Sequence, residues 1–165
     1  YLREELSRSR EVVYAKWFQG RATFFSKEAF VHLLAYLRLD AKVLPKDSQN
    51  ILEFLINDSP LSTKQIKSAA ELEGRLNESA YNRAMKPLWH HLMIVGFGEF
   101  EDSSFPSLGV GATQSLFEEL WAEARSLSKE QGLKGLERLF SETNPFLKFA
   151  KKIDKETART YTYNL

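Results

Sequence analysis

The sequence predicts a mainly α-helical protein that carries one small β-hairpin. Apolar residues recur at steps of three and four along most of the chain, which is the spacing of one helix face. Between residues 93 and 111 they form two extended runs instead, separated by a polar tip around Glu101 and Asp102. Two short helices are expected directly before this hairpin, and the first begins at a capping box, Ser62 with Gln65. This order is that of a winged helix-turn-helix, here with flanking helices.

The chain divides into three predicted parts. They are an N-terminal helical segment that packs on the core, a winged-helix domain and a C-terminal helical extension, at residues 1–46, 47–124 and 125–165. The first boundary falls near Pro45, which separates two stretches of apolar periodicity. No apolar run reaches the roughly 18 to 20 residues that a membrane span requires, so no membrane association is expected.

Two helices are predicted in the N-terminal segment. The first covers residues 2–18, where apolar residues stand among charges, and Gly20 interrupts it. The second follows Ser26 and ends near Asp40, because Ser is a favoured N-cap and its apolar residues recur at helical steps.

Capping residues mark the helices of the central domain. The Ser62 hydroxyl and the Gln65 amide are placed to satisfy free N–H groups in the first helical turn. Gly74 lies in the turn after this helix, and a long helix begins at Thr113 beyond the hairpin. The other helix starts are expected at Asp47 or Ser48, at Asn77 or Ser79, and after Gly132.

The helix predicted over residues 78–92 carries the candidate nucleic-acid contacts. Asn82, Arg83 and Lys86 lie away from its apolar side, and such side chains reach base edges or phosphates. Any solvated helix carries similar residues, and Pro87 bends the element by removing a hydrogen bond, so both interpretations stay open. The expected DNA-binding residues are Lys64, Lys67, Asn82, Arg83 and Lys86, the first two as phosphate clamps on the preceding helix.

The predicted hairpin lacks the charges that usually accompany DNA binding. Residues 87–124 contain no Lys or Arg, whereas residues 93–124 contain six acids. The two chain ends, residues 1–46 and 125–165, are basic and each hold nine bases against five acids. An acidic hairpin repels phosphate and suits a basic protein partner, so protein–protein interaction through an acidic wing is the alternative function. The residues of that surface would be Glu99, Glu101 and Asp102, with Phe97, Phe100 or Phe105 exposed beside them.

No catalytic, cofactor or metal motif is recognisable. His90 and His91 are neighbours on a predicted helix and point about 100° apart, so they do not chelate one ion from one face. One packed and one exposed histidine are expected instead. The glycines at 96, 98, 109 and 111 are expected at strand ends and bulges. The absence of cysteine excludes disulfides and is compatible with a cytoplasmic protein.

Residues 16–27, KWFQGRATFFSK, interleave bases with aromatic side chains. This pattern suits stacking on unpaired nucleotides. Aromatic residues in such a segment more often belong to the core, and that interpretation is favoured here.

Several segments of the chain resemble the AlkZ-related proteins, which are kin of the bacterial winged-helix DNA glycosylases that unhook interstrand crosslinks. The segments are QGRATFFSKEAF, PLSTKQIK, YNRAMKPLWHHLMIVGFGE and FPSLGVGATQSLFEELWAEA, within roughly Gln19 to Ala124. The resemblance implies tandem winged-helix or helix-turn-helix units and a link to DNA repair or regulation.

The resemblance does not extend to catalysis. The glycosylases of this group act on the base through a Gln-x-Gln motif, and no two glutamines of this chain stand in that spacing. The expectation is therefore a non-catalytic winged-helix protein that binds double-stranded DNA. A glycosylase with an atypical catalytic set is a weaker alternative.

Overall fold

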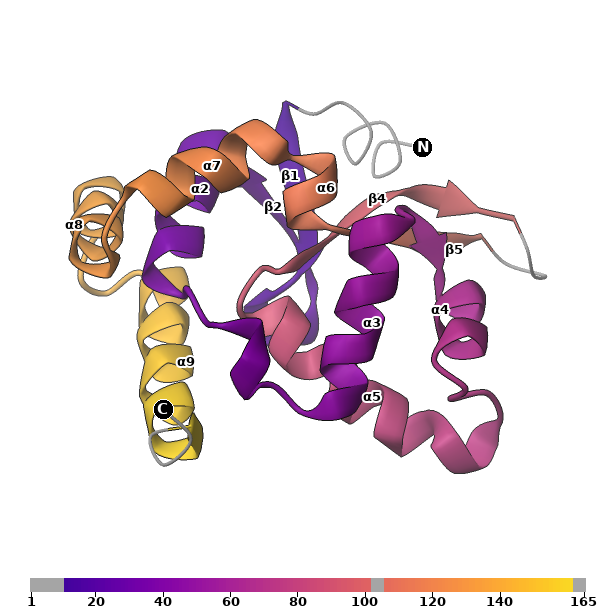
Figure 1. The fold of residues 1–165 in the computed structure, drawn as a ribbon. Helices are drawn as coiled ribbons and strands as arrows, with labels where there is room; N and C mark the ends of the chain where they lie inside the picture. Colours follow the sequence, from indigo (N-terminus) through magenta and orange to yellow (C-terminus); the bar gives the residue numbers. More distant parts are fainter. Residues whose placement is uncertain (1–10, 102–105, 162–165) are drawn as a thin grey trace.

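The computed structural model describes residues 11–101 and 106–161 (Figure 1). It is mainly helical, as the sequence predicts, but its small antiparallel sheet has five strands rather than the two of the predicted hairpin. The helices are α2 (Lys27–Tyr36), α3 (Lys46–Asn57), α4 (Thr63–Ala69), α5 (Glu78–His90), α6 (Thr113–Leu116), α7 (Glu118–Ser126), α8 (Lys129–Leu139) and α9 (Pro145–Tyr161). The strands are β1 (Val12–Lys16), β2 (Ala22–Ser26), β3 (Leu61–Ser62), β4 (Ile94–Phe100) and β5 (Ser107–Ala112). Three short 3-10 turns are η1 (Phe18–Gly20), η2 (Ala41–Val43) and η3 (Arg75–Asn77).

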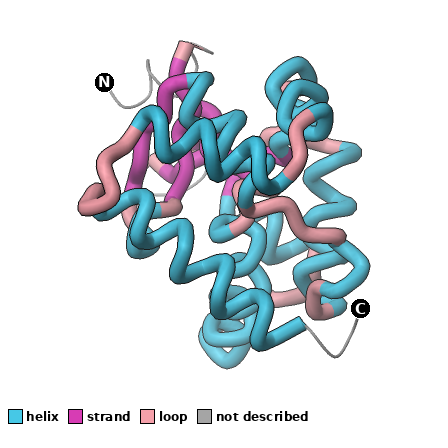
Figure 2. Tube along the Cα trace, turned by 90° about the vertical axis from the view of Figure 1, so that its left-hand side faces the viewer, coloured by secondary structure: helices cyan, strands magenta, loops and turns pink. Residues whose placement is uncertain are grey.

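The sheet joins the N-terminal strands β1 and β2 to the β4–β5 hairpin and to β3. Its strand order is β2-β1-β4-β5-β3, and every neighbouring pair is antiparallel. Helices occupy most of the remaining volume, as Figure 2 shows. One apolar cluster lies among β1, β2, α2, α8 and α9, and a second lies among α3, α4, α5 and the β4–β5 hairpin. Trp89 packs against both clusters and so connects the two halves of the core.

The helix predicted over residues 2–18 is wrong for its described part. Val12–Lys16 is strand β1, and it pairs with β2 so that Tyr14 lies opposite Phe24. The run Val12-Val13-Tyr14 is β-branched and aromatic, which favours a strand over a helix. Residues 1–10 of the predicted helix lie outside the described residues.

The helix caps are confirmed at two positions and wrong at one. The Ser26 hydroxyl accepts from the Ala29 N–H at 3.2 Å, and Ser62 and Gln65 form the full capping box. Helix α3 begins at Lys46 with Pro45 as its N-cap, so neither Asp47 nor Ser48 caps it. Ser48 is buried instead, and its hydroxyl donates to the Ala84 carbonyl at 2.7 Å, which fastens α3 to α5.

The predicted hairpin is present as β4 and β5. Their register shifts between Gly96 and Glu99, and Gly98 has a φ of 74°, so the expected bulge is confirmed. A Cβ atom at Gly96 would lie 2.3 Å from the Tyr14 ring, so only glycine lets β1 pack beside β4 there.

The helices after the hairpin differ from the prediction in their boundaries. The single helix expected from Thr113 is divided into α6 and α7, because Phe117 has φ −130° and ψ 59°. Helix α8 begins at Lys129, before Gly132, and the Ser128–Gln131 capping box accounts for this start. Across the described residues, no helix combines the length and the apolar character that crossing a membrane requires.

Candidate nucleic-acid interface

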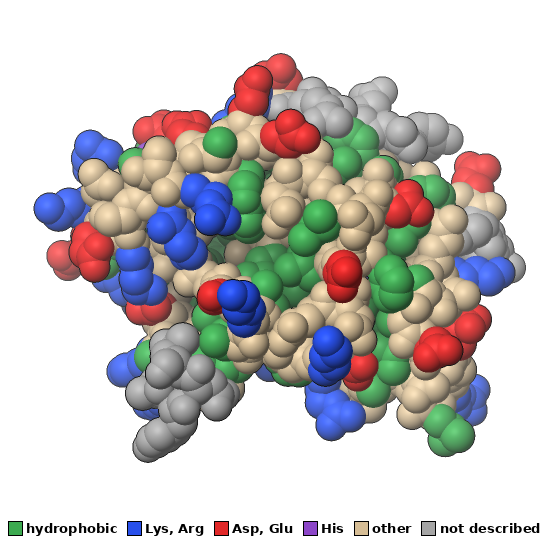
Figure 3. Space-filling model, viewed as in Figure 1, with side chains coloured by type: hydrophobic (Ala, Val, Ile, Leu, Met, Phe, Trp, Pro, Cys, Tyr) green, Lys and Arg blue, Asp and Glu red, His purple; other side chains and the backbone are tan. Residues whose placement is uncertain are grey.

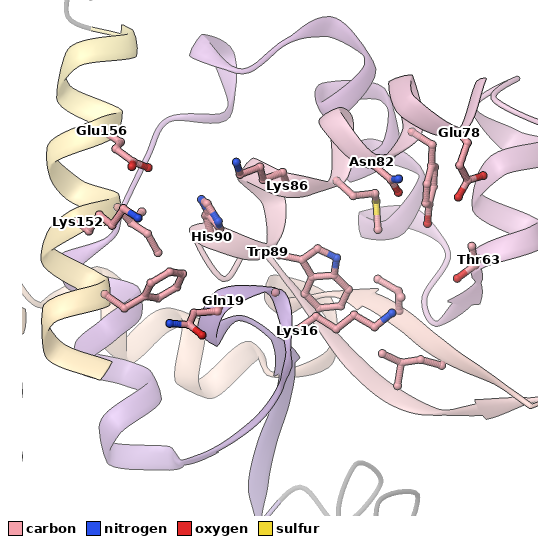
Figure 4. A pocket seen from close by; sticks show the side chains of 17 residues that line it. Lys16, Gln19, Thr63, Glu78, Asn82, Lys86, Trp89, His90, Lys152 and Glu156 are labelled. Carbon is pink, nitrogen blue, oxygen red and sulfur yellow. The ribbon is translucent and has the colours of Figure 1, made fainter. Parts of the chain in front are cut away.

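Helix α5 borders a cavity of about 710 Å³ with exposed as well as buried side chains (Figure 4). Helix α5 forms one wall, α9 forms the opposite wall, and the turn between β1 and β2 lies between them. The charged side chains at this cavity are three lysines and two glutamates: Lys16, Lys86, Lys152, Glu78 and Glu156. The cavity therefore brings together residues from the beginning, the middle and the end of the chain.

The structure places three of the five expected DNA-binding residues on one exposed face. Asn82, Arg83 and Lys86 are exposed on α5 and line a shallow groove together with Arg75. Lys64 is exposed on α4, apart from that groove.

Lys67 already has a partner within the protein. Its Nζ lies 2.6 Å from a carboxylate oxygen of Glu78 and 4.9 Å from the centroid of the Tyr81 ring. This ion pair neutralises Glu78 at the edge of the α5 groove. The Glu78 carboxylate therefore does not offset the positive charges of Arg83 and Lys86 on that face. Lys67 thus acts by neutralising Glu78, and its ammonium group is not free to bind a ligand.

Helix α5 is held firmly from its inner side. Tyr81, Ala84, Met85 and Leu88 are buried in the second apolar cluster, against residues of α3. The hydrogen bond from Ser48 to the Ala84 carbonyl adds a polar contact at the centre of this packing. The outward residues of α5 are therefore presented by a rigid element.

The turn between β1 and β2 contributes residues that the sequence analysis missed. Gln19 has a φ of 54° and points its side chain toward the cavity, as Figure 4 shows. The Arg21 guanidinium donates to the Gln19 side-chain oxygen, and the Phe18 N–H donates to the Thr23 hydroxyl at 3.0 Å. Gly20 follows Gln19 with a φ of 75°, and glycine is the usual turn residue at such a φ. This turn was not recognised from the sequence, because a helix was predicted through residue 18.

An aromatic cluster fixes this turn against α5 and α9. The Trp17 indole N–H donates to the His90 carbonyl at 3.1 Å. The Phe149 ring of α9 contacts the Trp17 ring edge-on at 4.9 Å, and Phe18 contacts Phe146 at 4.6 Å. Trp17 and Phe25 are buried, so these two aromatic residues of the segment belong to the core, as expected. Phe24 is 40% exposed and packs on Tyr14.

The two neighbouring histidines have different environments. His91 is buried: its Nδ1–H donates to the Leu37 carbonyl at 2.6 Å, and its Nε2 accepts from the Thr157 hydroxyl at 3.0 Å. Burial lowers the pKa of His91 to about 4. His90 is half-buried at the cavity, and burial, followed by the positive charge of Lys86, lowers its pKa. Both rings are therefore neutral at pH 7, and the described residues contain no cluster of metal ligands.

The β4–β5 hairpin has one exposed acid among its described residues. Glu101 is exposed, while Glu99 is half-buried. Phe97 and Phe100 are half-buried rather than exposed, and Phe97 packs on Phe117 with 6.4 Å between ring centroids. Asp102 and Phe105 lie outside the described residues.

The family model for AlkZ-related proteins matches residues 1–155. The chain therefore belongs to the AlkZ-related family, and the match extends beyond the Gln19–Ala124 resemblance at both ends. No curated protein and no solved structure matches the chain.

Proposed function

We propose that residues 47–124 form a winged helix and that α5 binds double-stranded DNA without catalysis. The order α3, β3, α4, α5, β4 and β5, with β3 and β4 both paired to β5, supports the winged-helix assignment. In helix-turn-helix proteins the second helix of the turn motif enters the major groove, and α5 is that helix here. Membership in the AlkZ-related family supports the link to DNA.

The observation that carries the proposal is the composition of the exposed face of α5. Asn82 offers an amide for base edges, while Arg83 and Lys86 offer cations for guanine or phosphate. All three lie on a helix whose opposite face is buried, so little ordering of the backbone is needed on binding.

The surrounding charges add local attraction for phosphate. Lys16 of β1 and Lys152 of α9 line the 710 Å³ cavity beside α5, and the charge of Glu78 is offset by Lys67. The whole chain has a net charge of only +1, so attraction depends on this local arrangement rather than on total charge. Glu156 of α9 and Glu101 of the hairpin act against binding.

Salt dependence tests this proposal. If about four phosphates are neutralised, raising salt from 50 to 200 mM weakens duplex binding by roughly a hundredfold, because releasing counterions into more concentrated salt is less favourable. Fluorescence anisotropy with a labelled duplex measures this change. A dissociation constant that stays flat across this range would remove the physical basis of the proposal.

A second function, capture of a basic protein by the hairpin, has support from the exposed carboxylate of Glu101. In that case DNA affinity is negligible at every salt concentration. The weaker glycosylase alternative has a separate test, since base release from an alkylated or crosslinked duplex would contradict a non-catalytic role.

A further inference from the structure

A second cavity, of about 460 Å³, is lined by no residue of α5, the helix of the proposed DNA surface. It is bordered by the end of α2, by η2, by α3 and by α6 and α7, and no residue lines both cavities. On the face drawn in Figure 3, apolar side chains form the floor of a hollow, with Lys and Arg side chains along its rim. Its volume is within the usual range for small-molecule sites.

The floor of this second cavity is apolar. Leu34, Leu52 and Met93 are buried, while Leu39 and Trp121 are half-buried. Such a lining accepts an aliphatic chain or an aromatic ring and offers it no hydrogen bond. His91 also borders the cavity, but both of its ring nitrogens are already occupied, by Leu37 and Thr157.

The rim offers hydrogen-bond donors that the described protein does not use. Arg125 is exposed and, within residues 11–101 and 106–161, has no carboxylate within ion-pair distance and no hydrogen bond. The half-buried side-chain amide of Gln114 also has no hydrogen-bond partner in that part of the chain. Arg38 uses one terminal nitrogen to donate to the Ala124 and Leu127 carbonyls, at 2.6 and 2.7 Å.

The charge balance of the rim favours an anion. Asp40 is the one carboxylate among the residues that line this cavity, and one of its oxygens accepts from the Lys42 N–H at 2.9 Å. The charged side chains that line the cavity are therefore two arginines and one aspartate, and that aspartate already caps η2. A guanidinium and an amide placed over an apolar chamber match a carboxylate with an apolar body.

We propose that this second cavity binds a small apolar monocarboxylate. The carboxylate lies against Arg125 and Gln114 with Arg38 beside it, and the apolar body fills the chamber between Leu34, Leu52 and Met93. This site is separate from the proposed DNA surface, so either proposal can fail without the other.

The two methionines of the chain provide a direct test. Met85 lines the first cavity and Met93 lines the second, so a protein labelled on its methionine methyl groups reports each site by one NMR signal. Octanoate is the probe, and octanol and octylamine are its neutral and cationic counterparts. We expect octanoate to shift the Met93 signal and leave Met85 unchanged, with octanol binding at least about tenfold more weakly.

Matched variants separate the charge from the chamber. Arg125→Gln is expected to weaken octanoate binding about tenfold, and Arg138→Gln, on the exposed side of α8, is expected to leave it unchanged. Ala41→Phe fills part of the chamber and should abolish the Met93 shift, while an unmoved Met85 signal verifies that the variant is folded. Equal binding of octanoate and octanol, an Arg125→Gln variant with unchanged affinity, or no Met93 shift would each overturn the proposal.

Discussion

His91 shows how this fold determines the charge state of one side chain. The ring is buried near the C-terminal end of α2. Both of its nitrogens are hydrogen-bonded there, one to the Leu37 carbonyl and the other to the Thr157 hydroxyl. Protonation would place a charge in a buried, largely apolar environment, which is the main reason for the lowered pKa. The sequence predicts one packed histidine in this pair, but only the tertiary contacts with Leu37 and Thr157 identify it as His91.

The lowered pKa of His91 predicts a stability that depends on pH. Because the folded pKa is about 4 and the ordinary value is 6.5, the unfolded chain binds the proton more readily between these values. Stability is therefore full above about pH 6.5 and falls as the pH drops toward 4, by roughly 3 kcal/mol at most for this group. Urea unfolding of the wild type and of His91→Gln at pH 7 and about pH 4.5 measures the difference.

The wild type should lose more stability than His91→Gln over this range, since the other titrating groups are common to both proteins. His32→Gln serves as the control, because it removes a histidine and leaves the His91 contacts in place. Equal losses for the wild type and His91→Gln would show that His91 does not titrate in this way.

At the scale of elements, close packing of α8 on α2 depends on glycine. A Cβ atom at Gly132 would lie 2.7 Å from the Tyr36 backbone nitrogen and 2.8 Å from the His32 carbonyl oxygen. A Cβ at Gly135 would meet the His32 ring itself. Backbone atoms cannot rotate away as a flexible side chain does, so Gly132 is the stricter of these two positions.

Gly132→Ala is expected to destabilise the protein although alanine is the better helix former. The helical preference gains about 1 kcal/mol, but separating α8 from α2 costs more, in the range of about 1 to 3 kcal/mol for overpacking. Thermal unfolding measures the balance, and Lys134→Ala on the exposed side of α8 should change stability by no more than about 0.5 kcal/mol. A Gly132→Ala variant at least as stable as the wild type would contradict the packing argument.

The hairpin carries the prediction that separates the two proposed functions. If α5 binds DNA, the hairpin lies near the phosphate backbone, so Glu101→Lys removes a repulsion and adds an attraction. We expect tighter duplex binding by up to about tenfold, which corresponds to 1.4 kcal/mol, in an anisotropy titration. Glu123→Lys, an exposed charge change on α7, is the control. A gain of the same size for both variants would assign the effect to net charge rather than to the hairpin.

At the scale of the whole molecule, the sequence predicts the features that depend on neighbouring residues better than those that depend on long-range contacts. The Ser62–Gln65 capping box, the β4–β5 hairpin and the bulge near Gly98 depend on a few neighbouring residues, and all three are present. The β1 strand was missed because its five residues, VVYAK, form a short apolar run without alternation, beside a stretch with helical spacing. The sequence predicts only part of the candidate site, for a related reason. Gln19 and Lys152 reach the cavity from distant elements, and no local pattern links these elements to α5.

The central claim is that α5 binds DNA, and the most direct measurement compares two double variants with the wild type across a salt series. Arg83→Ala with Lys86→Ala removes both cations from the exposed face of α5, while Lys42→Ala with Arg138→Ala removes two exposed cations elsewhere. We predict that the first pair weakens duplex binding at least about tenfold and makes the log–log salt slope less negative by about 1.8, since two phosphate contacts are lost. The second pair should match the wild type. Unchanged affinity and slope in the first pair would contradict the assignment of α5 as the DNA-binding surface.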